Sequence, residues 1–278
     1  MLGPTPASLD GARDLAAALA RARDALGHRP LLTVLRPGVR EEQSAVSLAQ
    51  WAAKGAHLLS ADLLLEPGDR LHLDAGLGWP AVAVLYAAWW SGVVVELPDQ
   101  QPPSPSDPSD PSNPSDPSDP ATVAVLQEGR PASAGVEEVL WLGDAIDGGP
   151  SAAVGGEAWT RACQAFPDHP PPPQAGPDTL ALVVGGLEWT HAQLLERARS
   201  LGLDGPFGVE VATDGRWAAG PAAAGEAADQ AAGEPRTLAV IAASAVRPLL
   251  AGRPTAVLRG VDRAAASGER IRGWLLTG

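Results

Sequence analysis

Residues 71–97, LHLDAGLGWPAVAVLYAAWWSGVVVEL, contain a long apolar segment with one short apolar segment on each side of it. We predict a strand in LHLDA at 71–75, a helix over about 79–91 and a second strand in VVVEL at 93–97. The connections between these three elements are short. Strands and helices that alternate in this way are typical of a parallel sheet, so the chain is predicted to have an α/β fold.

The same alternation extends over most of the chain. The apolar patterns predict further strands at 30–35, 121–126, 138–143, 179–184, 207–212, 237–243 and 255–260. They predict further helices over 9–26 with Ser8 as its cap, from Ser47 onward, and over 156–166, 190–201, 245–252 and 262–276. We therefore expect parallel sheets flanked by helices.

A proline-rich repeat interrupts this pattern. Residues 102–120, PPSPSDPSDPSNPSDPSDP, repeat Ser-Asp-Pro almost without variation. Proline fixes φ and removes a hydrogen-bond donor, and nothing in the repeat can be buried, so we expect a disordered linker or surface insertion. The repeat divides the sequence into a first α/β half at 1–98, a linker at 99–120 and a second α/β half at 121–278. Together the halves would form one domain.

The composition argues against several classes of partner. The formal net charge is −13 at pH 7, and such a surface repels nucleic acid and anionic lipid. No apolar run is long enough to span a bilayer, and the N-terminus lacks the basic and apolar regions of a signal peptide. The single cysteine, Cys163, rules out an internal disulfide and fits a reducing compartment. We therefore predict a cytoplasmic protein with no nucleic-acid and no membrane partner.

The turn after the strand at 71–75 has the spacing of a dinucleotide fingerprint. Gly76-x-Gly78-x-x-Ala81 lies between a strand and a helix. Glu96 ends the next strand, twenty residues after Gly76. In a fingerprint the glycines let the pyrophosphate approach the helix N-terminus, and the acid binds the ribose hydroxyls. Alternatively, the glycines form only the turn that any strand–helix–strand unit needs. Only if the turn is a true fingerprint would a cofactor, NAD(P), be bound by Gly76, Gly78 and Glu96.

A second glycine pair, at 185–186, follows the strand at 179–184 and precedes a helix. A phosphate loop needs several backbone donors and usually a lysine, but GGLEWT supplies an acid and no nearby lysine. Thr190 and Gln193 instead have the spacing of a capping box. We expect His191, in the same first turn, to be an exposed helix residue rather than a catalyst.

Other catalytic and metal-binding patterns are missing from the sequence. There is no G-x-S-x-G elbow, and the five histidines are scattered without a CxxC motif. Cys163 is most simply a small core residue. We therefore predict no catalytic residue, no metal site and no cofactor.

Residues 47–99 resemble the opening of the adenylate-forming, AMP-binding acyl-CoA synthetase superfamily. That region carries a G-x-x-P-G-D-R-V turn and a helix ending A-G-A-V-x-V-P, which residues 66–70 and 91–95 match. LEWTHAQLLERARSLGL at 187–203 is similar to the helix after the phosphate loop, and VRPLLAGRPTAVLRGVD at 246–262 to a later strand. The nearest likeness is to a short AMP-binding-like family of high-GC bacteria. The resemblance implies the fold of the N-terminal α/β part of the superfamily.

The chain departs from this resemblance at the residues that carry the chemistry. Members have a Ser/Thr/Gly-rich loop ending in Pro-Lys for the ATP phosphates, and the matching place, VVGGLEWT, has neither feature. The Y-G-x-T-E and T-G-D motifs are also missing, since the single tyrosine, Tyr86, is followed by Ala87. Members carry a catalytic lysine on a small C-terminal domain, for which we expect no counterpart in 278 residues. Lys54, the single lysine, lies in an early predicted helix.

Three hypotheses stay open. The first is a non-catalytic AMP-binding-like protein that acts as a binding or interaction module for a small ligand or a protein partner. Its pocket is expected between the strands at 179–184 and 237–243. The second is an NAD(P)-dependent enzyme that uses the GLGWPA turn. The third is a structural subunit that docks on a partner through apolar surface. The ligand and the oligomeric state are left open.

Overall fold

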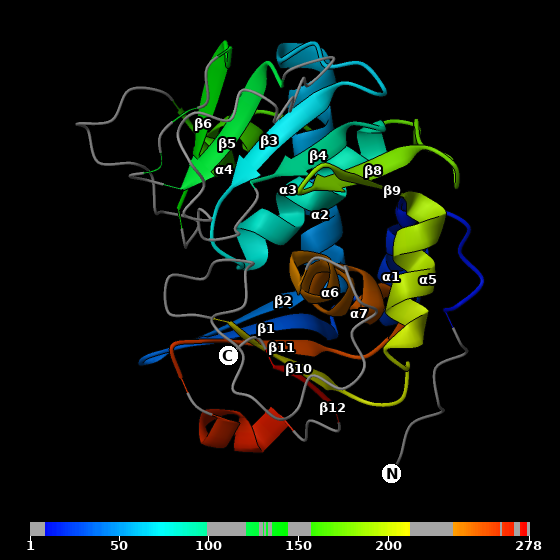
Figure 1. The fold of residues 1–278 in the computed structure, drawn as a ribbon, viewed down its shortest axis with the longest axis vertical. Coiled ribbons are helices and arrows are strands. Elements are labelled where there is room, and N and C mark those ends of the chain that lie inside the picture. The colour runs from blue at the N-terminus through cyan, green and yellow to red at the C-terminus, as the bar shows by residue number, and fades with distance from the viewer. Residues whose placement is uncertain are drawn as a thin grey trace, which may run out of the picture.

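Two β-sheets enclose a layer of helices (Figure 1). The computed structural model describes residues 9–98, 121–127, 130, 132, 135–143, 157–211, 236–261, 263–269 and 273–276. The linker predicted at 99–120 lies outside the described residues. Both sheets consist mainly of parallel strands and have helices against them, so the predicted α/β fold with parallel sheets flanked by helices is confirmed.

The larger sheet has the strand order β7-β6-β5-β3-β4-β8-β9. Its members are β3 (Arg70–Asp74), β4 (Val94–Leu97), β5 (Val123–Gln127), β6 (Glu138–Leu142), β7 (Glu157–Ala158), β8 (Leu180–Val184) and β9 (Leu187–Thr190). All neighbouring strands in it are parallel except β8 and β9, which form an antiparallel hairpin. Five of these strands, β3, β4, β5, β6 and β8, lie where the apolar patterns predict them.

The smaller sheet has the strand order β12-β10-β11-β1-β2. Its members are β1 (Pro30–Arg36), β2 (Val39–Ser44), β10 (Phe207–Val211), β11 (Thr255–Arg259) and β12 (Gly273–Leu276). β2 is antiparallel to β1, and the other pairs are parallel. Each sheet takes strands from both sides of residues 99–120, so the two halves of the sequence interleave around one continuous hydrophobic core.

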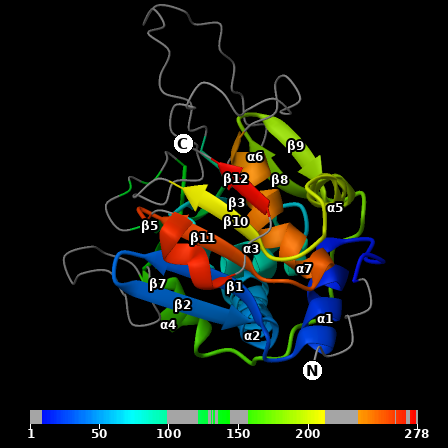
Figure 2. The same ribbon diagram turned by 90° about the horizontal axis from the view of Figure 1, so that it is seen from below.

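The helices occupy the space between and beside the sheets (Figures 1 and 2). They are α1 (Leu15–Leu26), α2 (Ala45–His57), α3 (Trp79–Ser91), α4 (Trp159–Cys163), α5 (His191–Ser200), α6 (Arg236–Ile241) and α7 (Arg247–Ala251). A π-helical turn, η1 (Leu58–Asp62), extends α2, and another, η2 (Ala242–Val246), joins α6 to α7. A short 3-10 helix, η3 (Arg263–Glu269), follows β11. None of the described helices has the length and hydropathy of a membrane span.

α3 is the central helix, and all 13 of its residues are buried. Tyr86 Oη donates a hydrogen bond to Ala245 O of η2 at 2.6 Å. Trp89 Nε1 donates to Ala181 O of β8 at 3.0 Å. Because these two bonds reach the helical stretch on the smaller sheet and a strand of the larger one, they satisfy the buried donors and also join the two layers.

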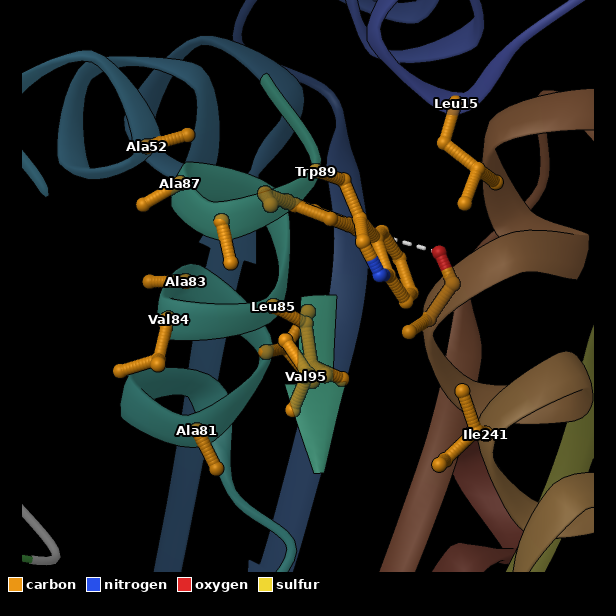
Figure 3. Packing of buried hydrophobic residues seen from close by; sticks show 14 of the residues in the cluster. Leu15, Ala52, Ala81, Ala83, Val84, Leu85, Ala87, Trp89, Val95 and Ile241 are labelled. Atoms are coloured by element: carbon orange, nitrogen blue, oxygen red, sulfur yellow. Dashed lines mark hydrogen bonds between the residues drawn. The ribbon is translucent and has the colours of Figure 1, made fainter. Parts of the chain in front are cut away.

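The apolar side chains of α3 point to both of its neighbours. In Figure 3, Ala87 of α3 points toward Ala52 of α2. Leu85 and Trp89 lie on the other side of α3, toward Ile241 of α6. Ala87 thus leaves room for α2 to pack close to α3, whereas Trp89 extends to the other side and bonds to β8. This division lets one helix be enclosed on both sides.

Three predicted elements differ from the structure. The strand predicted at 237–243 is the helical stretch α6–η2, because an apolar run of this length fits a buried helix as well as a buried strand. The helix predicted over 262–276 is replaced by η3 and β12. The first helix begins at Leu15 with Asp14 as its cap, rather than at Ser8. The pocket expected between strands at 179–184 and 237–243 thus lacks its second strand.

Gly55 of α2 lies where three helices approach one another. A Cβ at this position would lie 2.6 Å from Trp159 Cζ2 of α4 and 2.7 Å from Ala87 Cβ of α3. We predict that Gly55→Ala lowers the free energy of unfolding by about 1–3 kcal/mol, because overpacking outweighs the gain in helix propensity. Urea unfolding measures the change. Combined with Trp159→Leu, the substitution should cost less than the sum of the two separate losses. An unchanged or raised midpoint for Gly55→Ala would contradict this packing.

Leu64, just after η1, has a backbone conformation that favours glycine. Its φ is 55°, and its side chain is 73% exposed. In the turn pattern that residues 66–70 match, glycine stands at this position. A left-handed conformation costs an L-residue about 1 kcal/mol or more, and little apolar burial offsets it here.

We predict that Leu64→Gly raises the free energy of unfolding by about 1 kcal/mol, because glycine removes this strain. The shift is measured by thermal unfolding. Leu64→Ala, which keeps the Cβ, is the matched control and should bring no such gain. Equal stabilisation by both variants would show that exposure of the leucine, and not its backbone, is the cause.

Candidate functional site

The glycine pair at 185–186 forms the turn of the β8–β9 hairpin. Gly185 and Gly186 have φ values of 56° and 76°, which is the pattern of a type I′ turn and favours glycine at both positions. The predicted strand–turn–helix junction is therefore wrong, because a second strand precedes α5. The predicted capping box is confirmed: Thr190 Oγ1 accepts from Gln193 N, and Gln193 Oε1 accepts from Thr190 N.

The sequence resemblance predicts that the superfamily's phosphate loop would fall at this hairpin. Two residues connect the strands, so the backbone offers no run of N–H groups that could surround a phosphate. Beside the turn, Leu187 is 45% exposed. Glu188 Oε1 accepts from Arg70 Nη2 at 3.2 Å, so the basic side chain there is already paired with a carboxylate. The hairpin tip is therefore apolar and acidic.

The carboxyl ends of β3 and β5 meet where the strand order reverses. β3 leads through α3 to β4 on one side, whereas β5 is followed by β6 on the other. In open parallel sheets such a switch point is the usual place for a ligand. Gly76 N donates to Gln127 Oε1 at 3.0 Å, and Arg130 Nε lies 3.7 Å from Asp74 Oδ1. Polar groups at the two strand ends are thus joined to each other.

The N-terminus of α3 faces the carboxyl end of the smaller sheet. Its N-cap, Gly78, has an extended backbone and makes no side-chain capping bond. A Cβ built there would lie 3.7 Å from Nη1 of Arg259, the buried last residue of β11. Arg36, the last residue of β1, lies beside Arg259, because the residues before them, Leu35 and Leu258, are paired. Arg36 is ion-paired with Glu41. The strand ends of the smaller sheet thus place positive charge near a helix end that favours anions.

The three residues of the fingerprint lie in two different places. Gly76 and Gly78 are buried in the β3–α3 turn. Glu96 lies in β4, one residue before its end, opposite His72 of β3 and Val183 of β8. The connectivity of the fingerprint is therefore present, but the Gly76 N–H is already bonded to Gln127.

His191 is fully buried, so the prediction of an exposed residue is wrong. Its Nδ1 accepts a hydrogen bond from Leu15 N at the start of α1, at 3.2 Å, which requires the neutral ring. Burial lowers the pKa of His191 to about 4, and the Asp14 carboxylate only partly offsets this effect. Nothing in the local sequence signals this burial, because it depends on α5 packing against α1.

Lys54 and Cys163 have structural surroundings. Lys54 Nζ donates to Phe166 O at 2.7 Å and so ties α2 to the segment after α4. Cys163 is buried, as predicted, and burial raises the pKa of its thiol, which disfavours the reactive thiolate. Across the part of the chain that the structure describes, no three His, Cys, Asp or Glu side chains are grouped as metal ligands.

The chain is similar in fold to several solved structures. An acyl-CoA synthetase from Brucella canis has a TM-score of 0.63 at 14% identity, over 94% of this chain and 45% of that chain. A fatty acyl-adenylate ligase from L. pneumophila has a TM-score of 0.60 at 12% identity, over 91% and 40%. The NpsA N-terminal subdomain from Klebsiella oxytoca has 0.53 at 12% identity, over 91% and 57%. The fold is that of the N-terminal part of the adenylate-forming enzymes. At these identities the likeness concerns the fold alone.

A match by sequence covers part of the chain. A TIGR03089 family protein of Mycobacterium tuberculosis is 38% identical over 95 residues, which are 34% of this chain and 38% of that protein. No family profile matches the chain. The chain spans between 38% and 57% of the proteins described here.

The buried neutral His191 makes stability depend on pH. Its folded pKa of about 4 lies below the unfolded value of about 6.5, so the unfolded chain binds the extra proton first. We predict that the free energy of unfolding falls, by on the order of 3 kcal/mol at most, as the pH drops from 6.5 to 4. Urea unfolding across this range measures the slope.

His191→Asn keeps an acceptor for Leu15 N but does not titrate, so it should flatten that slope. His28→Asn, at an exposed histidine, is the matched control and should leave the slope as it is. A slope that persists in His191→Asn would show that other groups cause it.

Proposed function

We propose that this chain is a non-catalytic AMP-binding-like protein that acts as a binding or interaction module. The observation that carries the proposal is the two-residue Gly185-Gly186 turn of the β8–β9 hairpin, because the sequence resemblance predicts a phosphate loop at this place. A chain with this fold can keep the sheets that surround a ligand and still lack the loop that holds ATP.

Electrostatics supports this proposal. Adenylation develops negative charge on the oxygens around phosphorus, and enzymes stabilise it with metal ions, cationic side chains and backbone donors. The loss of one such group typically costs about 10²–10³ in rate. At the hairpin tip the basic side chain, Arg70, is bonded to Glu188, and the loop supplies neither lysine nor hydroxyl groups. Several of the required groups are therefore missing together.

The site of a small ligand would be the carboxyl ends of the two sheets rather than the hairpin. This is where β3 and β5 reverse the strand order and where Arg259 reaches the start of α3. A monophosphate such as AMP needs fewer donors than a triphosphate. Binding without turnover is thus the behaviour that these groups favour.

An ATP–pyrophosphate exchange assay tests the proposal. With Mg²⁺, ATP and a series of fatty and aromatic carboxylates, we expect exchange no faster than in the protein-free reaction, because no phosphate cradle is present. A carboxylate-dependent exchange above that background would refute the non-catalytic role.

Calorimetric titration with AMP, ATP and acyl-CoA tests binding in the same samples. If AMP binds, Arg259→Met should weaken it about tenfold, the usual effect of removing one charge-assisted contact. Arg263→Met, in the exposed η3 helix, is the matched control and should bind as the unchanged chain does.

Dinucleotide binding is the second candidate, because β3, α3 and β4 form the connected unit that a fingerprint requires. NAD(H) or NADP(H) would then raise the thermal midpoint, and Gly78→Val would abolish the shift. No shift at millimolar cofactor would remove this candidate.

A further inference from the structure

The segment between α4 and β8 has a conformation set by its prolines. In His-Pro-Pro-Pro-Pro at 169–173, proline fixes φ near −65°, and each residue before a proline is kept out of the α region. The segment joins neither a helix nor a sheet. These restrictions leave a polyproline II strand, which has three residues per turn and no internal hydrogen bonds.

One edge of this strand is attached to the end of α3. Trp90 Nε1 donates to Pro171 O at 2.7 Å, and Gln174 N donates to Trp90 O at 3.1 Å. Residues 171 and 174 are three apart, so they share one edge of the strand. The other two edges face away from Trp90, and Pro172 and Pro173 on them are exposed.

A second exposed apolar feature borders the same end of α3. A Cβ on Gly92, the C-cap of α3, would lie 3.1 Å from Pro67 Cβ and 3.4 Å from Gln174 O, so the turn at 64–69 and the polyproline strand flank this glycine. The same turn holds Leu64 exposed in its left-handed conformation. We call Leu64, Pro67, Pro172 and Pro173 the end surface. Backbone strain at an exposed residue, which burial does not stabilise, points to a role other than stabilising the fold.

Acidic side chains surround the end surface. Asp62 and Glu66 are exposed beside Leu64, and Asp168 and Asp178 are exposed on either side of the polyproline strand. Neither 58–69 nor 164–178 contains a lysine or arginine. A partner that covers this surface would therefore need basic side chains around its own binding site.

We propose that the end surface docks a protein whose aromatic-lined groove, with a basic rim, accepts polyproline II segments. The strand is already in its bound conformation, so docking loses little conformational entropy. Leu64 adds an exposed apolar side chain in the turn on the other side of Gly92. The inference rests on the proposed role as an interaction module and names the chemistry of its partner.

Two recombinant domains serve as probes: a WW domain with a basic groove rim and an SH3 domain with an acidic one. The full chain should bind the WW domain with a Kd on the order of 100 µM and the SH3 domain at least about tenfold more weakly. Binding should weaken when NaCl is raised, because the acidic rim carries part of it. No binding of the WW domain at millimolar concentration would overturn the proposal.

Three variants of the chain locate the contact. Pro172→Ala with Pro173→Ala should weaken WW binding at least about tenfold without lowering the thermal midpoint, because both side chains are exposed. Leu64→Gly should also weaken WW binding, while it raises the stability of the fold. A variant that bound more weakly because it was partly unfolded would instead be less stable. Pro177→Ala, an exposed proline outside the run, is the control and should bind normally.

WW binding that the double proline variant leaves unchanged would refute the end surface as the docking site. Such a failure is separate from failure of the proposed function. Carboxylate-dependent exchange would remove the non-catalytic role, whereas these binding measurements do not depend on ATP.

Discussion

The burial of α3 on every side is the constraint on which the two-sheet arrangement depends. A helix with no polar face needs partners all around it, and here β4 of the larger sheet, α1, α2 and η2 supply them. Tyr86 and Trp89 then fix the layers, because their buried donors find carbonyls in η2 and β8. As a result the two ends of α3 lie in different surroundings. Gly78 meets the strand ends, and Gly92 meets the turn at 64–69 and the polyproline strand.

The proposed binding role depends on the form of one hairpin. A two-residue type I′ turn matches the twist of its strands, so β8 and β9 pair well around Gly185-Gly186 without a longer loop. A phosphate loop, in contrast, needs enough residues to turn several N–H groups toward one ligand. The two-residue turn is compatible with the fold and gives few N–H groups to a phosphate, and this is the observation on which the proposed binding role rests.

The sequence predicts those parts of the fold that short-range interactions determine. β3, α3 and β4 lie where the alternation of 71–97 indicates, and the Thr190–Gln193 capping box is contained in four residues. The helix predicted over 245–252 contains α7, but the α6–η2 stretch before it was not predictable in this way, because an apolar run fits a buried helix or a buried strand until its neighbours are known. His191 shows the same limit at the candidate site. Its burial depends on Leu15, 176 residues away, and local polarity indicates the opposite.

The described basic side chains near the sheets mostly serve the fold itself. Arg130 lies beside Asp74, and Lys54 bonds a carbonyl oxygen after α4. Arg247 donates to the carbonyls of 202 and 205 and stacks on the Phe207 ring at 4.5 Å; burial lowers its pKa to about 10, so it stays charged at neutral pH. To neutralise a triphosphate, such a cation would have to leave a buried carbonyl or carboxylate without its partner, which costs about as much as the new contact would gain. A net charge of −13 adds long-range repulsion to this local cost. The distribution of charge thus argues for a partner that brings its own cations, rather than for a polyanionic substrate.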